Sequence, residues 1–201
     1  MEREIIAYEE LKSSGITEST PKNIMLGAGT IHKGLTLTSG KWNFDESLIG
    51  ATSGGSKVSI VPEYMDIEVD GALVAVKGLK HKVGETATME VNFVEMTPDI
   101  LKMCVVGDVA DSEVYEGYSE ITSRARITEG DYIENLAYVG KKTDGTPIIV
   151  LFEQAICTSG FEVEGKNKEA GVFTGTFQCV ADVSPEADTL PWRILYPKQT
   201  V

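Results

Sequence analysis

The chain has 201 residues, of which 42% are hydrophobic, and its 31 acidic residues outnumber 18 basic ones to give a formal net charge of −13. This length suits one domain with a substantial core, and the charge has the wrong sign for a protein that grips nucleic acid through its phosphates. Three widely spaced cysteines predict free thiols in a reducing compartment rather than a disulfide framework.

The N-terminal region is predicted to be an extension over residues 1–22. Ile5, Tyr8 and Leu11 line one face of a short helix before SSGITESTPK turns polar, so a docked arm and a mobile tail are both open. MEREIIAYEE lacks the apolar run of a signal peptide. No segment reaches the 18 or so apolar residues of a membrane helix, and we expect a soluble protein made inside a cell.

Short runs of period two, separated by glycine, predict a β domain over residues 23–190 and a C-terminal arm over residues 191–201. MDIEVD reads as a half-buried strand with an acidic outer face. Asp70-Gly71 predicts a tight hairpin with ALVAVKGL as the returning strand. ATMEVNF alternates in the same way. YIENLAYVGK and PIIVLFEQAICT flank Asp144-Gly145 and predict a second hairpin, and GVFTGTFQCVADV ends the β pattern.

One helix is expected at about residues 97–106, in TPDILKMCVVGD. Thr97 can cap it, Pro98 suits its first turn, and Gly107 can end it. Its apolar face includes Ile100, Met103 and Cys104. The acidic, turn-rich residues 107–124 are expected to form a surface loop. The predicted class is therefore mainly β, a sandwich or barrel-like fold with one packed helix and extended loops or arms.

Two near-motifs in GATSGGSKVSIVPEYMDIEVDGAL do not support ligand binding. A phosphate loop ends in lysine and then a hydroxyl residue, but here Ser56 precedes Lys57, and the β-branched VSIVPEY cannot open the required helix. The acids of MDIEVDG match the first positions of a calcium loop. Lys77, however, stands where that loop needs a bidentate glutamate.

No catalytic residue, metal site or cofactor is predicted. His32 and His81 are the only histidines, and neither neighbours a carboxylate or cysteine at ligand spacing. There is no G-x-S-x-G. An acidic strand face is by default a solvated surface. We therefore expect a protein that is not an enzyme.

Several segments occur in a characteristic order: PKNIMLGAGTIHKGL, GATSGGSKVSIVPEYMDIEVDGALVAVKGLK, ATMEVNFVEMTPDILKM, the Asp144-Gly145 hairpin, and TFQCVADVSPEADTLPWRILYP. Over residues 23–197 they resemble the tail tube (major tail) proteins of long-tailed bacteriophages. The resemblance implies a small β-sandwich with a helix on one side. It further implies hexameric rings that stack into a hollow tube, each subunit giving four strands to a continuous inner barrel.

The resemblance also implies partners and a location. Besides its own copies, the chain would contact a tape-measure protein, the tail tip or baseplate, and a tail terminator protein, while DNA passes without specific binding. It would act in the virion after assembly in the bacterial cytoplasm, without inserting into a membrane. A long loop that reaches a neighbouring subunit is also implied, and our candidate is the set Thr52, Ser53, Gly54, Gly55, Ser56 and Lys57.

A barrel of roughly 24 tilted strands would be about 50 Å across at the backbone, wide enough for a duplex. Acidic side chains on its inner wall would repel phosphate. The candidate lumen residues are Asp66, Glu68 and Glu90, with Asp70 at the hairpin tip. In the alternative arrangement these acids face outward, and the small polar face of another strand pair lines the channel.

Two rival interpretations remain open. A non-contractile siphovirus tail is favoured, but contractile phage-tail-like particles share the tube fold. From a different class, a monomeric β-sandwich could bind a ligand such as a carbohydrate. Such modules usually expose aromatic side chains, and the tryptophans of this chain are Trp42 and Trp192.

Overall fold

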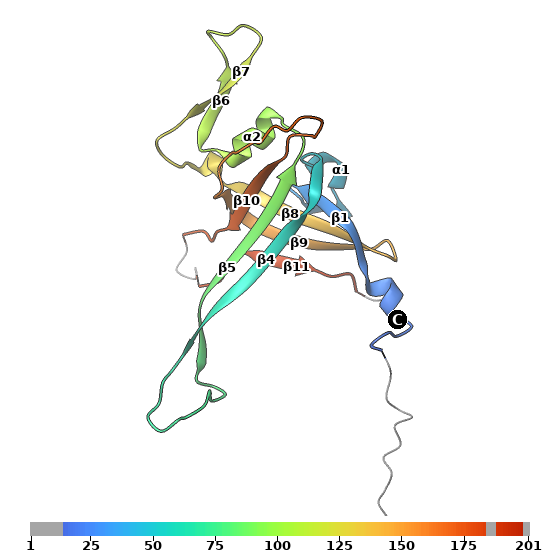
Figure 1. Ribbon diagram of the computed structural model, residues 1–201, viewed down its shortest axis with the longest axis vertical. Coiled ribbons are helices and arrows are strands. Elements are labelled where there is room, and N and C mark those ends of the chain that lie inside the picture. Colours follow the sequence, from blue (N-terminus) through green and yellow to red (C-terminus); the bar gives the residue numbers. More distant parts are fainter. Residues whose placement is uncertain (1–13, 184–187, 199–201) are drawn as a thin grey trace, which may run out of the picture.

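The computed structural model describes residues 14–183 and 188–198, and it is mainly β (Figure 1). One curled antiparallel sheet of seven strands dominates it, in the order β1-β8-β9-β10-β5-β4, with β11 beside β9. The strands are β1 (Met25–His32), β4 (Thr52–Asp66), β5 (Lys80–Phe93), β8 (Ile133–Lys142), β9 (Pro147–Cys157), β10 (Phe173–Cys179) and β11 (Trp192–Leu195). The predicted mainly β class is confirmed.

The main core lies inside the curl of this sheet. The predicted alternation in β5 is confirmed, because Ala87, Met89, Val91 and Phe93 are fully buried. The Phe93 ring stacks on Phe173 of β10 at a centroid distance of 5.2 Å. Large alternating side chains on one face thus bring β5 and β10 together around a shared interior.

The predicted helix is present as α2 (Pro98–Cys104) and packs against this core. The Thr97 hydroxyl accepts a hydrogen bond from the Ile100 N–H at 3.3 Å, which caps the first turn. Ile100, Met103 and Cys104 are buried, as their spacing predicted. The helix ends at Cys104, slightly earlier than expected.

The second predicted hairpin is also confirmed. β8 and β9 pair over most of their length, and residues 143–146 connect them. Gly145 has φ +87°, a left-handed conformation that favours glycine. The Asp144 carboxylate accepts a hydrogen bond from the Thr146 N–H at 2.9 Å and fixes the turn.

A second, smaller core lies on the other face of β8 and β9. Leu35, Ala137, Ile149 and Leu151 are buried there, with Trp42 and Phe44 packed against them. The covering segment contains β2 (Leu37–Thr38), β3 (Lys41–Trp42) and α1 (Phe44–Ser47).

His32 holds this covering segment to the sheet. Ser47 Oγ donates to the Asn43 carbonyl at 2.8 Å, so it accepts from Nδ1 of His32 at 2.9 Å, and Nε2 accepts from the Thr30 hydroxyl at 2.8 Å. Burial lowers the pKa of His32, although a backbone hydrogen bond to Phe44 acts in the opposite direction. The buried imidazole is therefore neutral near pH 7.

We expect this histidine to make stability depend on pH. Because its folded pKa lies below the unfolded value of about 6.5, the unfolded state binds more protons as the pH falls below that value. The free energy of unfolding should therefore decrease between pH 7.5 and 5.5. Urea titrations should show a smaller decrease in His32→Gln, while the exposed His81→Gln control should match the wild type. An equal slope in all three proteins would contradict this assignment.

Residues 48–51 close the curled sheet at one end. The Ile49 N–H donates to the Ile31 carbonyl at 3.2 Å, and the Val94 N–H donates to the Ala51 carbonyl at 3.0 Å. The segment thus bridges β1 to β5, and Ile49 packs against the main core. β4 follows this segment directly, so β1 and β4, the two outer strands of the sheet, lie near each other at this end (Figure 1).

Three expectations about local structure were wrong. Residues 107–124 form a hairpin of β6 (Gly107–Asp111) and β7 (Ser119–Ser123), not a loop. ALVAVKGL is not a returning strand, since residues 67–79 are a loop and the return begins at Lys80. The predicted C-terminal arm contains β11, which pairs with β9 as part of the main sheet.

The predicted N-terminal extension is described only from residue 14. It contains η2 (Thr20–Asn23), a short 3-10 helix. The predicted helix face of Ile5, Tyr8 and Leu11 lies outside the described residues. A second short 3-10 helix, η3 (Glu129–Asp131), precedes β8.

Candidate functional site: a polar sheet face and a projecting arm

The outer face of β4, β5 and β10 carries small polar side chains. We call it the polar face; it comprises Lys57, Ser59, Thr86, Thr88, Glu90, Asn92, Thr174, Thr176 and Gln178. Their neighbours in each strand point into the core, so strand alternation puts these residues on the opposite side. All of them are exposed or partly exposed, and none belongs to either hydrophobic core.

Strand pairing arranges these residues in rows. Glu90 lies between Lys57 on β4 and Thr176 on β10, and in the next row Thr88 lies beside Ser59 and Gln178. The Thr174 hydroxyl donates to the Asn92 side chain at 2.7 Å. The result is a surface of hydroxyl and amide groups in which one lysine offsets one carboxylate.

The glycine-rich segment lies at the edge of this face and is not a free loop. Thr52 to Lys57 belong to β4, although the register with β5 shifts between Thr52 and Ser56. Gly54 and Gly55 have φ of +78° and +85°, which only glycine adopts readily and which suits a bulge. Asn92 donates to the Gly55 carbonyl at 3.1 Å and holds the bulge to β5. The predicted loop conformation was wrong, while its inter-subunit role stays a prediction.

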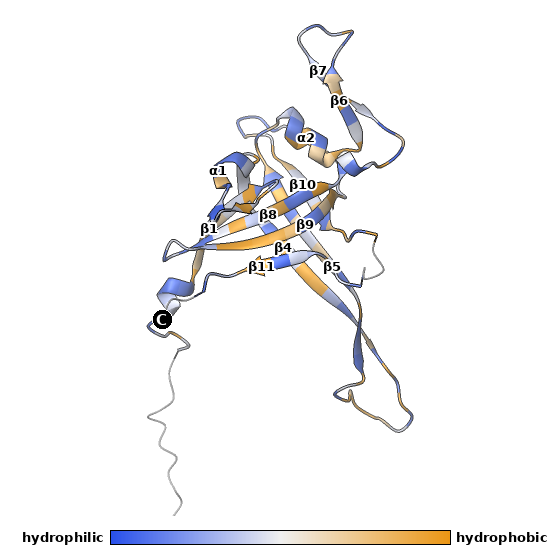
Figure 2. Cartoon of the chain, turned by 180° about the vertical axis from the view of Figure 1, so that it is seen from behind, coloured by the Kyte–Doolittle hydropathy of each residue, from blue (hydrophilic) through white to orange (hydrophobic). Residues whose placement is uncertain are grey.

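Beyond the core, β4 and β5 continue as a projecting arm, residues 61–83 (Figure 1). Hydrophobic and hydrophilic residues are mixed along both of its strands and its loop (Figure 2). Its exposed large apolar residues are Val61, Tyr64, Met65, Ile67, Val69, Leu73, Val74, Val76 and Val83. Leu73 and Val74, in the loop of residues 67–79, are 96% and 76% exposed. An apolar surface of this extent typically marks an interaction site.

The four candidate lumen residues do not lie together. Asp66 ends β4 and pairs with Lys80 at 2.7 Å, while Glu68 and Asp70 lie in the loop of the arm. Glu90 lies on the polar face, ten residues along β5 from Lys80, or about 33 Å at 3.3 Å per residue. One subunit therefore does not gather these acids into a single wall, and their lumen role stays a prediction.

Sequence reasoning missed the polar face. Its signal was visible in residues 86–92 and 174–178, where small polar residues alternate with buried ones. Only the pairing of β10 with β5 and of β5 with β4 joins these alternations into one surface.

Groups that would indicate chemistry are scattered. No cluster of three or more potential metal ligands occurs in the described part of the chain. His81 is exposed on the arm, far from the buried His32. The thiols of Cys104, Cys157 and Cys179 form no disulfide, and those of Cys104 and Cys157 lie within hydrogen-bonding reach of each other. Among residues 14–183 and 188–198, no helix has the length and apolarity to cross a membrane.

Comparison with known proteins gives distant structural similarity and no sequence match. No protein-family model and no curated protein matches this sequence. A solved structure described as the virion of a native gene transfer agent (GTA) particle contains a chain that is 12% identical. The match covers 83% of this chain and 95% of that chain, with a TM-score of 0.38.

Proposed function

We propose that this protein is a structural virion protein of a long-tailed phage, whose copies form hexameric rings stacked into a hollow tail tube that delivers DNA. The observation that carries the proposal is the exposed polar face beside the edge of β4, which in the described part of the chain has no partner strand beyond the end that residues 48–51 close. Exposed sheet edges are templates for pairing with another chain. β4 has 15 residues and ends the strand order, so a neighbouring copy can extend the sheet along it.

Ring closure would turn the polar faces of all copies toward one channel. Hydroxyl and amide side chains offer DNA phosphates no cluster of positive charge, and Lys57 lies beside Glu90. A wall of this kind lets a polyanion slide without strong attraction or repulsion. This lining differs from both arrangements anticipated from the sequence, because it keeps Glu90 on the wall but leaves Asp66, Glu68 and Asp70 on the arm.

The arm supplies a contact between copies. Burying an exposed valine or leucine side chain contributes about 1.5–3 kcal/mol, and residues 61–83 expose several. The arm extends away from the body at the end opposite α2 (Figure 1). We therefore assign it to a contact with a copy in the adjacent ring. If the protein forms a tail tube, the tape-measure, tip and terminator proteins are its further expected partners.

The two tryptophans do not serve the rival binding module, although Tyr64, Tyr115 and Tyr118 are exposed. Trp42 packs with Phe44 in the smaller core, at a centroid distance of 6.2 Å. Trp192 packs against the main core, and its Nε1 donates to Glu85 at 3.2 Å. Both indoles therefore serve the fold rather than an exposed sugar platform.

Electron microscopy of the purified protein tests the proposal. A concentration series in negative stain, including high salt to screen the net charge, should show six-fold rings or hollow rods. A helical reconstruction should then place the polar face on the inner wall. Protein that remains monomeric at every concentration and salt would contradict self-assembly, and an inner wall built from other strands would contradict the assignment of the polar face.

A further inference from the structure

A second hairpin, β6–β7, projects at the α2 end of the molecule (Figure 1). Residues 107–123 contain no lysine or arginine and five acidic residues: Asp108, Asp111, Glu113, Glu116 and Glu120. Asp108 pairs with Arg124 at the base of the hairpin. Near the tip, Val114, Tyr115 and Tyr118 are exposed. The hairpin is thus an acidic projection with an aromatic tip.

Local hydrogen bonds fix its shape. The Ser112 N–H donates to the Tyr118 carbonyl at 2.8 Å, and the Ser112 hydroxyl accepts from the Tyr115 N–H at 3.0 Å and donates to Glu120 at 3.0 Å. At the base, a Cβ on Gly107 would lie 2.4 Å from the Thr122 carbonyl oxygen, so only glycine allows this close approach. A projection ordered in this way loses little entropy when it binds.

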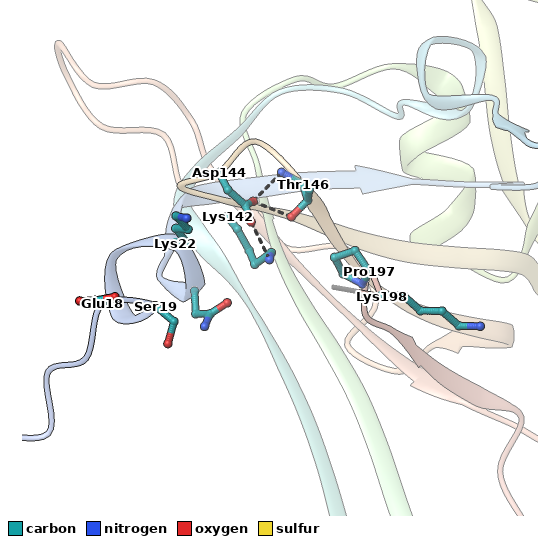
Figure 3. Close-up of a pocket in the computed structure, with 9 residues that line it drawn as sticks. Glu18, Ser19, Lys22, Lys142, Asp144, Thr146, Pro197 and Lys198 are labelled. Atoms are coloured by element: carbon teal, nitrogen blue, oxygen red, sulfur yellow. Dashed lines mark hydrogen bonds and ion pairs between the residues drawn. The ribbon is translucent and has the colours of Figure 1, made fainter. Parts of the chain in front are cut away.

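A lysine-lined hollow of about 470 Å³ lies at the other end of the body (Figure 3). Three elements meet there: η2 with Lys22, the end of β8 with Lys142, and the C-terminal residues with Lys198. Lys142 is almost fully buried, with its ammonium 2.9 Å from Asp144 and 5.1 Å from the centre of the Tyr196 ring. Among the described residues neither Lys22 nor Lys198 forms an ion pair.

Two acids also line the hollow. Asp144 is fully engaged, by Lys142 and by the backbone and hydroxyl of Thr146. Glu18 is the other. With Lys142 and Asp144 paired, the charges of Lys22 and Glu18 cancel and Lys198 leaves the lining with an excess positive charge. The Lys198 side chain extends away from the other lining residues (Figure 3). An acidic partner that reaches Lys22 and Lys198 would neutralise their positive charge.

We propose that the acidic β6–β7 hairpin of one copy docks in the lysine-lined hollow of the next copy. The inference rests on the proposed function, because it specifies the contact between stacked subunits. The hairpin and the hollow lie at opposite ends of the body (Figures 1 and 2), so the hairpin cannot fold back into its own hollow. A contact between two different surfaces repeats from copy to copy and builds an open stack.

Opposite charges indicate which residues of the hairpin and of the hollow meet at this contact. Glu113 and Glu116 flank Tyr115 and are exposed, so they can reach Lys22 and Lys198 of the next copy while the tyrosine enters the hollow. Complementary charge of this kind fixes register and suppresses wrong pairings. It also makes assembly sensitive to salt.

Charge reversal with rescue tests the docking. Sedimentation should show that Glu113→Lys/Glu116→Lys and Lys22→Glu/Lys198→Glu each raise the concentration for half-assembly by more than about tenfold. The protein with all four changes should return to within about threefold of the wild type. Glu162→Lys/Glu169→Lys, an equal charge change on an exposed loop, should assemble as the wild type does. Reversal without effect, or four changes without rescue, would overturn the docking.

A crosslinking experiment tests the docking contact independently of the proposal that the protein forms a tube. With a photoreactive benzoylphenylalanine in place of Tyr115, we expect a crosslink to residues 18–23 or 196–198 of another copy. That crosslink in protein that forms no rods would support the docking and contradict the tube. Rods whose Tyr115 position crosslinks only elsewhere would support the tube and overturn the docking.

Discussion

Replacing residues 67–79 by Asn-Gly should leave a folded monomer that no longer forms rods. Asp66 and Lys80 are directly paired, so a two-residue turn can close the hairpin between them. The change removes Leu73 and Val74, which contribute nothing to either core. Circular dichroism and urea unfolding should match the wild type, while electron microscopy should show no rods at concentrations where the wild type assembles.

Point substitutions distinguish the loss of apolar side chains from the shortening of the loop. Leu73→Ser/Val74→Ser should also reduce assembly, because it removes the most exposed aliphatic side chains of the arm. Val163→Ser/Val172→Ser exchanges two exposed valines outside the arm for the same polar residue and should leave assembly unchanged. Rods from the shortened protein at the wild-type yield would remove the arm from the contact between copies.

Asp131→Ala should lower the free energy of unfolding by about 2 kcal/mol, within the range for losing a hydrogen bond to a charged group, because the two cations that remain are partly exposed. The side chain of Asp131 is 2% exposed. It accepts from Lys102 at 2.6 Å and from the Thr128 N–H at 2.8 Å, and it also pairs with Arg124. The substitution leaves two cations without their shared anion. Urea titration at pH 7 measures the change, and a loss below about 1 kcal/mol would contradict the predicted weight of this network.

The same carboxylate should contribute to stability in acid. Burial alone would raise the pKa of Asp131, but hydrogen bonds from Lys102, Thr128 and Arg124 outweigh burial and hold it below its ordinary value. Its stabilisation is therefore present above the unfolded pKa of about 3.9 and is lost as the pH falls through the folded pKa. Wild type and Asp131→Ala should thus converge below pH 4. This window is separate from that of His32.

The elements predicted well are those whose signal is local. Thr97 and Pro98 mark the start of α2, and the alternation in β5 marks its buried face, because each depends on neighbours a few residues apart. Asp144-Gly145 likewise encodes its own turn.

The errors arose where tertiary context decides. The alternation in residues 65–70 looked like a half-buried strand, but a period of two reports only which side chains share a face, not whether anything covers it. In the molecule both faces are exposed and β4 ends at Asp66. The acidic composition of residues 107–124 suggested a loop, yet cross-strand pairing makes them a hairpin. The polar face needed the strand order, which no local pattern contains.

Closure of the sheet by residues 48–51 allows folding of the chain to finish before assembly begins. Since the bridge from β1 to β5 completes the hydrophobic interior within one chain, each copy can reach its native state before it meets another. A tube would then grow by adding monomers that are already folded. The rate of tube growth would depend on the concentration of folded monomer and on the number of growing ends. It would not depend on the rate of folding.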